Sequence, residues 1–183
     1  YNHHVNMVDW VYEEFNKLPY LGPVVTPPKT DDLHEYYMDW FVNDGAPFWP
    51  FWENIRTWWE TRNLANVHFI HYQNLKDDMA GEMQKIGEFL GYDVNGLKKA
   101  TWDKMVHQCT FDYMKENATL STPLGGDMFN GGAATFVNKG TNNRWKDTLT
   151  KTDCDVYEAR AIKELGPECA HWLATGEFLN EGG

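Results

Sequence analysis

The segment Val67-His68-Phe69-Ile70-His71-Tyr72 decides which class of fold the sequence predicts. It is short and rich in β-branched and aromatic residues, and such runs favour a β-strand. A helical pattern precedes it at residues 51–63, and another follows from Asp77 or Asp78, either of which can cap a helix. Helices that alternate with a short buried strand are typical of α/β proteins with a parallel sheet. We therefore expect an α/β fold that is mostly helical and has few strands.

The helical segments on either side carry apolar residues at helical spacing. Trp52, Ile55 and Trp59 share one face of the first segment. Gly91 is expected to end the second. The residues expected to point inward from the second segment are Met79, Met83, Ile86 and Leu90. Further helices are predicted at residues 2–18, 31–43, 97–108 and 111–116, and from about residue 153 with a break at Gly166-Pro167.

Residues 117–135 lack this periodicity and include Gly125, Gly126, Gly131 and Gly132. A loop of this length in a compact domain is usually either functional or disordered. We expect it to form part of a binding site and to close over it.

Composition limits the classes of function. The chain has 183 residues, with 16 Lys and Arg against 27 Asp and Glu, so its net charge is −11 at pH 7. This length suits one domain. The acidic balance argues against general nucleic-acid binding, which depends on clustered basic charge. No apolar run approaches the roughly 18 residues that span a membrane. The cysteines Cys109, Cys154 and Cys169 are widely spaced, which predicts neither a disulfide framework nor a zinc site and indicates a reducing cytoplasm.

Metal-binding and acid–base sites have weak support. His68 and His71 lie three residues apart on the expected strand and so point to opposite faces, which prevents them from chelating one ion. Helix capping and solvation explain the acidic pairs without catalysis. These pairs are Glu13-Glu14, Asp31-Asp32 and Asp77-Asp78. We expect no bound metal.

A cluster of tryptophans leaves two interpretations open. Indole rings bury large areas, so most of them are expected in the core. The same rings, if exposed together, would form a platform on which a sugar stacks. The residues concerned are Trp40, Trp49, Trp52, Trp58 and Trp59.

The segment 136–146 concentrates positive charge in an acidic chain: Lys139, Arg144 and Lys146 lie within eight residues. Glycine at position 140 lets the backbone approach a ligand, and consecutive amides in a turn form an anion-binding nest. Lys139 adds a point charge, and Thr141 and the asparagines donate hydrogen bonds. The segment suits a phosphate ester, with a solvated surface loop as the alternative.

At these residues the chain resembles the sulfotransferases that use 3′-phosphoadenosine 5′-phosphosulfate (PAPS), specifically the soluble, cytosolic-type family. That family has a late loop, Phe-x-Arg-Lys-Gly-x-x-x-x-Trp-Lys, which binds the donor's 3′-phosphate. Here the frame reads Phe136-Val137-Asn138-Lys139-Gly140 and then Trp145-Lys146. The resemblance therefore implies that Phe136, Val137, Asn138, Lys139 and Gly140 bind the donor.

Two further blocks carry the resemblance. The block Phe69-Ile70-His71-Tyr72-Gln73-Asn74-Leu75-Lys76 is similar to the family's strand that ends in Tyr-Glu-Asp-Leu/Ile-Lys, which implies that Tyr72 touches the adenine. The block from Cys109 to Asn117 is similar to the family's Thr-Ser-Phe-x-x-Met-Lys-x-Asn. It implies that Thr110 hydrogen-bonds the adenine and that Phe111 stacks on it.

The resemblance implies an enzyme that transfers a sulfuryl group from PAPS to a hydroxyl of a small-molecule acceptor. It covers the C-terminal part of a P-loop-like parallel-sheet fold, so residues 1–183 are expected to be part of one domain. The family's phosphosulfate loop and histidine base are not in this sequence, and we expect no catalytic residue in it. The implied partners are PAPS, its product adenosine 3′,5′-bisphosphate (PAP), the acceptor, and the remaining half of the domain or another chain. The alternative is a non-catalytic aromatic-rich module that binds carbohydrate or protein.

Two departures from the family are visible. The loop arginine of the family is Asn138 here, and Arg144 is a candidate to restore its charge. The family's dimer motif, Lys-x-x-x-Thr-Val-x-x-x-Glu, has Lys151 in place of its valine, so that type of dimer is not expected.

Overall fold

The structure is a computed structural model that describes residues 2–17, 24–46 and 50–179. The chain forms two compact units. Unit 1 comprises Tyr1–Asn54 and Met114–Cys154, and unit 2 comprises Ile55–Tyr113 and Asp155–Gly183. We describe each unit by itself.

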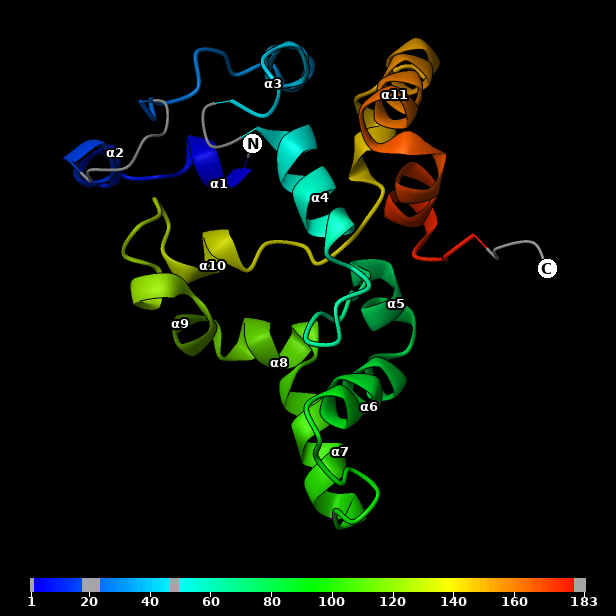
Figure 1. The fold of residues 1–183 in the computed structure, drawn as a ribbon. Coiled ribbons are helices and arrows are strands. Elements are labelled where there is room, and N and C mark those ends of the chain that lie inside the picture. Colours follow the sequence, from blue (N-terminus) through cyan, green and yellow to red (C-terminus); the bar gives the residue numbers. More distant parts are fainter. Residues whose placement is uncertain (1, 18–23, 47–49, 180–183) are drawn as a thin grey trace. The chain divides into compact units, whose positions relative to one another are not determined.

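Both units are built from helices (Figure 1). Unit 1 contains α1 (Asn2–Val5), α2 (Asp9–Lys17), α3 (Leu33–Val42), α9 (Ala118–Ser121), the 3-10 turn η1 (Pro123–Gly126), α10 (Ala133–Phe136) and the 3-10 turn η2 (Arg144–Asp147). Unit 2 contains α5 (Tyr72–Asp77), α6 (Met79–Phe89) and α7 (Lys99–Gln108). Three helices run from one unit into the other: α4 (Phe51–Glu60), α8 (Phe111–Glu116) and α11 (Lys151–Thr175).

The predicted strand at residues 67–72 is wrong. His71 has extended backbone angles (φ −95°, ψ 132°), but Tyr72 already begins α5. A strand needs a neighbour to pair its backbone N–H and C=O groups. Within the ranges that the structure describes, the β-pairing consists of one isolated antiparallel bridge, between Met7 and Phe129. The fold is therefore mostly helical, as expected, but the parallel sheet of the predicted α/β class is not seen in it.

The predicted helix at residues 2–18 is interrupted, and residue 18 lies outside the described residues. The chain leaves the helix at Asn6 because its backbone bonds to another segment. The Val8 N–H donates to the Met128 carbonyl at 3.0 Å, and the Asn130 N–H donates to the Asn6 carbonyl at 2.7 Å. Tertiary pairing here overrides local helical periodicity.

Other helix boundaries follow the sequence closely. Asp32 caps α3, since its Oδ1 accepts from the Glu35 N–H at 2.7 Å, and Asp78 caps α6 through the Gly81 N–H at 2.9 Å. Gly91 has a positive φ of 79°, as a residue just past a helix end requires. The break in α11 falls at Gly166, as predicted.

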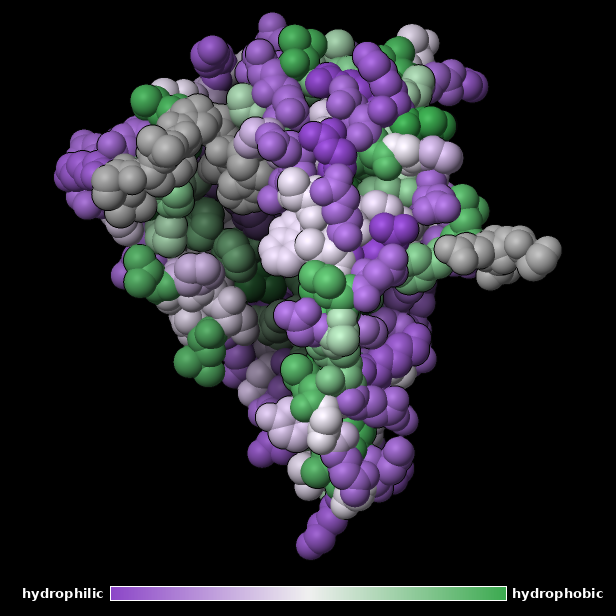
Figure 2. Space-filling model, in the orientation of Figure 1, coloured by the Kyte–Doolittle hydropathy of each residue, from purple (hydrophilic) through white to green (hydrophobic). Residues whose placement is uncertain are grey.

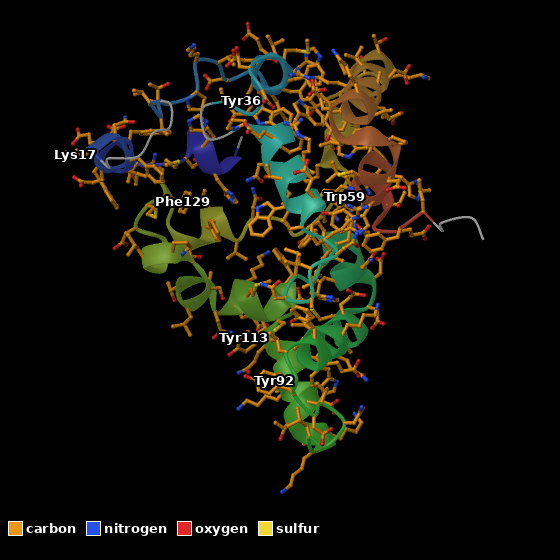
Figure 3. All side chains as sticks on the ribbon, in the orientation of Figure 1. Lys17, Tyr36, Trp59, Tyr92, Tyr113 and Phe129 are labelled. Atoms are coloured by element: carbon orange, nitrogen blue, oxygen red, sulfur yellow. The ribbon has the colours of Figure 1, made fainter. Side chains whose placement is uncertain are left out.

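The core of unit 1 gathers apolar side chains from both of its sequence segments. Phe129, which precedes α10, belongs to this core and is labelled in Figure 3. The buried apolar residues of this unit are Val11, Tyr12, Val25, Phe41, Trp52, Phe129, Ala133 and Val137.

In unit 2 an aromatic cluster holds the C-terminal end of α4 against α11. Trp59 and Trp172 are buried, with ring centres 5.7 Å apart, and Phe69 packs edge-on against both.

The apolar face of α6 is less enclosed than predicted: Leu90, just past the end of the helix, is 60% exposed. Figure 2 shows hydrophobic residues interspersed with hydrophilic ones over α6 and α7.

Residues 117–135, predicted as a long loop, contain α9, η1 and most of α10. Five residues with positive φ produce the tight turns of this segment. They are Leu124, Gly125, Gly126, Gly131 and Gly132. The glycines that obscured the helical periodicity are thus the residues that fold the segment compactly.

Candidate functional site

The candidate anion-binding loop begins where α10 ends. The Asn138 N–H donates to the Phe136 carbonyl at 3.0 Å, and Val137 between them has φ −81° and ψ 73°. These values define an inverse γ-turn. Val137 is buried, and Gly140 has a positive φ of 62°. The turn therefore anchors the loop on the core and directs Asn138, Lys139 and Gly140 away from it.

The basic side chains of this segment have no carboxylate partner within the described ranges. Lys139 and Arg144 are exposed and form no ion pair there. The Lys146 Nζ lies 5.5 Å from the ring centre of Trp145, which is 48% exposed. In a chain with a net charge of −11, this unpaired positive charge is available to an external anion.

In unit 2, Tyr72 is the first residue of α5 and is 58% exposed. Its neighbour His71 fixes the start of the helix: the His71 Nε2 donates to the Leu173 carbonyl at 3.1 Å. Asn74 Nδ2 also donates to the Gly176 carbonyl at 3.3 Å. The two contacts tie the first turn of α5 to the end of α11, while the Tyr72 ring stays accessible.

Thr110 directly precedes α8, and Phe111 is the first residue of that helix. The Thr110 hydroxyl donates to the His107 carbonyl at 2.7 Å and accepts from the Tyr113 N–H at 3.3 Å. A hydroxyl has one donor and two acceptor positions, so one lone pair of Thr110 is left for a ligand. Thr110 and Phe111 are both partly exposed. Thr110 can therefore accept a hydrogen bond, from an amino group for example, without losing its role at the helix start.

The structure places the predicted donor-binding residues in two groups. Residues 136–140 form one continuous turn in unit 1, and Tyr72, Thr110 and Phe111 belong to unit 2. The sequence reasoning missed His3, whose ring stacks on Phe136 with centres 4.7 Å apart. Nothing in the sequence pattern connects two residues so distant along the chain.

The tryptophans predicted either as core residues or as a sugar-stacking platform are not all exposed. Trp52 and Trp59 are buried at 3% and 8% exposure, and Trp58 is 59% exposed. Trp49 lies outside the described residues. The burial of Trp52 favours the core interpretation over a sugar-stacking platform.

Three further features bear on the possible functions. Cys109, Cys154 and Cys169 are free thiols. Among the described residues there is no group of three or more His, Cys, Asp or Glu side chains placed to hold a metal ion. Nor does the described part of the chain contain a helix long and apolar enough to cross a membrane.

Comparison with known proteins assigns the family. Residues 1–165 match the protein family described as "Sulfotransferase domain". Sulfotransferase 1A1 of Rattus norvegicus is 30% identical over 155 residues, which cover 84% of this chain and 50% of the rat protein. Sulfotransferase 1B1 of Mus musculus is 28% identical over 132 residues, which cover 72% of this chain and 43% of the mouse protein. The chain therefore belongs to the sulfotransferase domain family and spans about half the length of these relatives.

A solved structure shares the fold. The crystal structure of mouse sulfotransferase SULT7A1 complexed with PAP superposes with a TM-score of 0.64 at 18% sequence identity. The match covers 91% of this chain and 58% of the mouse chain. The match shows a sulfotransferase-like fold, whereas the P-loop-like parallel sheet expected from the motifs is not seen in the described residues.

Proposed function

We propose that this chain supplies the adenine- and 3′-phosphate-binding part of a sulfotransferase that uses PAPS. The single observation that carries the proposal is the turn at Phe136–Gly140, which presents an exposed lysine with no ion pair to a described residue beside a glycine with positive φ. Family membership and the PAP bound to the mouse relative support the same ligand.

The reaction is an in-line transfer. The acceptor hydroxyl oxygen attacks the sulfur of PAPS, a base takes the hydroxyl proton, and the bond from sulfur to the 5′-phosphate oxygen breaks. PAP leaves with the bonding electron pair. Neutralising the phosphates and holding the donor in line with the acceptor lowers the barrier. In this proposal the base and the phosphosulfate loop that the family resemblance implies are supplied from outside this chain.

At the phosphate end, Lys139 contributes a full charge and Gly140 gives the phosphate close access to the backbone. Asn138 replaces a bidentate arginine with a neutral amide donor. Arg144, exposed six residues further on, restores the second charge in this proposal.

At the adenine end, three side chains have complementary chemistry. The exposed ring of Tyr72 and the partly exposed ring of Phe111 provide faces for a purine. The remaining lone pair of Thr110 accepts from the adenine amino group. These interactions recognise the base, and the loop in unit 1 recognises the phosphate.

The free thiols fit a reducing, cytoplasmic location.

Isothermal titration calorimetry with two nucleotides tests the proposal. PAP carries the 3′-phosphate and adenosine 5′-monophosphate lacks it. We expect Lys139→Ala to weaken PAP binding about tenfold, the effect of losing a hydrogen bond to a charged group, and to leave adenosine 5′-monophosphate unaffected. Phe111→Ala should weaken both nucleotides.

The matched control is Lys29→Ala, since Lys29 is also an exposed lysine of unit 1 without an ion pair to a described residue. It should leave both affinities unchanged. If Lys139→Ala and Lys29→Ala lose PAP affinity equally, the change in net charge explains the loss, and the assignment of the loop as the phosphate site is refuted. Absence of PAP binding by the wild-type protein would refute the proposed function.

A further inference from the structure

His3 makes two contacts with the residue that opens the anion-binding loop. Its ring stacks on the Phe136 ring with centres 4.7 Å apart and planes inclined by 16°. Its Nε2 lies 3.1 Å from the Phe136 carbonyl oxygen. A carbonyl oxygen only accepts, so the Nε2 carries the proton and donates it.

The same carbonyl oxygen closes the γ-turn. It accepts from the Asn138 N–H at 3.0 Å and from His3, so both of its lone pairs are used. The orientation of this peptide group sets the direction in which Asn138, Lys139 and Gly140 leave α10. His3 thus holds the turn from outside, on a helix that precedes it by more than 130 residues.

The stack extends to a third ring. Phe129, which is labelled in Figure 3, is buried, with its ring centre 5.3 Å from that of Phe136 and 5.8 Å from that of His3. His3 itself is exposed. Removing its ring therefore leaves Phe129 and Phe136 in contact and the core of unit 1 filled.

We propose that His3 is a positioning residue for the proposed 3′-phosphate loop, fixing the Phe136 carbonyl so that residues 138–140 are ordered before the ligand arrives. The proposal rests on the proposed function of that loop. Preorganisation of this kind raises affinity by reducing the entropy lost on binding. Its signature is a change in loop order and PAP affinity with little change in stability.

Two substitutions separate the contacts. His3→Phe keeps an aromatic ring and removes the donor, whereas His3→Gln keeps a donor at nearly the position of Nε2 and removes the ring. We expect His3→Phe to weaken PAP binding roughly fivefold, the effect of one neutral hydrogen bond. His3→Gln should restore most of this loss, and both variants should melt within a few degrees of wild type.

A second measurement needs no ligand. Backbone ¹⁵N relaxation reports picosecond-to-nanosecond order. In His3→Phe the order parameters of Lys139 and Gly140 should fall, and in His3→Gln they should stay close to wild type. The control is His34→Phe, because His34 is a partly exposed histidine of unit 1 whose Nε2 pairs with Asp153 and not with the loop.

The outcomes are distinct. Unchanged loop order in His3→Phe would overturn the role of His3, whether or not PAP binds. Reduced order in the free protein without any loss of PAP affinity would overturn the link to the phosphate site. If His3→Phe lowers the loop order relative to wild type but the wild-type protein does not bind PAP, the proposed function is contradicted and the structural role of His3 stands.

Discussion

A Cβ atom at Gly126 would lie 2.1 Å from the backbone nitrogen of Ala133, the first residue of α10. Gly126 also has a φ of 100°, and its carbonyl accepts from the Phe129 N–H at 2.9 Å. The close approach lets η1 lie against the helix that ends at Phe136. Glycine at position 126 is thus part of what supports the candidate anion-binding loop.

Gly126→Ala should therefore be strongly destabilising. Left-handed backbone costs a non-glycine residue about 1–2 kcal/mol, and overpacking against Ala133 adds a further ~1–3 kcal/mol. Gly125→Ala is the matched control, since its φ is 63° and the nearest atom to its Cβ is 3.8 Å away. Urea unfolding should show a clearly larger loss for Gly126→Ala. Equal losses of unfolding free energy at the two positions would mean that the close approach to Ala133 does not contribute to the cost of Gly126→Ala.

A buried histidine should make the stability of unit 1 depend on pH. Burial lowers the pKa of His4 below its ordinary value of 6.5, and the hydrogen bond to the Thr26 carbonyl partly offsets this. The fold therefore prefers neutral His4. As the pH falls through 6.5, the unfolded chain binds the proton first, so the free energy of unfolding should fall. It should be fully retained above that range.

Urea titrations at pH 7.5 and 5.5 measure this effect. In His4→Gln the difference between the two free energies of unfolding should shrink relative to wild type. His68→Gln, which changes an exposed histidine, should keep the wild-type difference. A difference that survives in His4→Gln would assign the pH dependence to other groups.

Substituting a buried tryptophan of unit 2 should lower the free energy of unfolding far more than substituting an exposed one. Trp172 is 9% exposed and contacts the rings of Trp59, Phe69 and His71, so Trp172→Ala should cost about 3–5 kcal/mol of unfolding free energy. Trp58 is 59% exposed, and Trp58→Ala should change it by less than about 0.5 kcal/mol. Chemical denaturation of the two variants tests this. Comparable losses would contradict the packing described for α4 and α11.

Local signals predicted most of the helices. Asp32 and Asp78 cap helices as expected, and Gly166 breaks α11, because each of these effects acts within one turn of the chain. The strand at residues 67–72 failed for the opposite reason. Its β-favouring composition indicates that the segment can form a strand. Whether a neighbouring strand is present to pair with it depends on the rest of the fold and not on the segment.

The candidate site was predictable only where it is continuous in sequence. The motif from Phe136 to Gly140 forms one turn, so its residues could be assigned together. Contacts that join distant segments were not predictable, since no local period relates His3 to Phe136 or Met7 to Phe129. Whether Tyr72, Thr110 and Phe111 contact one ligand also depends on distant segments, and it stays a prediction.

The most direct test of the account is a crystal structure of the protein with PAP bound. We predict that the adenine stacks on Phe111 and touches Tyr72, and that the 3′-phosphate of the same molecule accepts a hydrogen bond from Lys139. A nucleotide that contacts Phe111 while its 3′-phosphate lies away from Lys139, or that binds at neither place, would contradict the central claim.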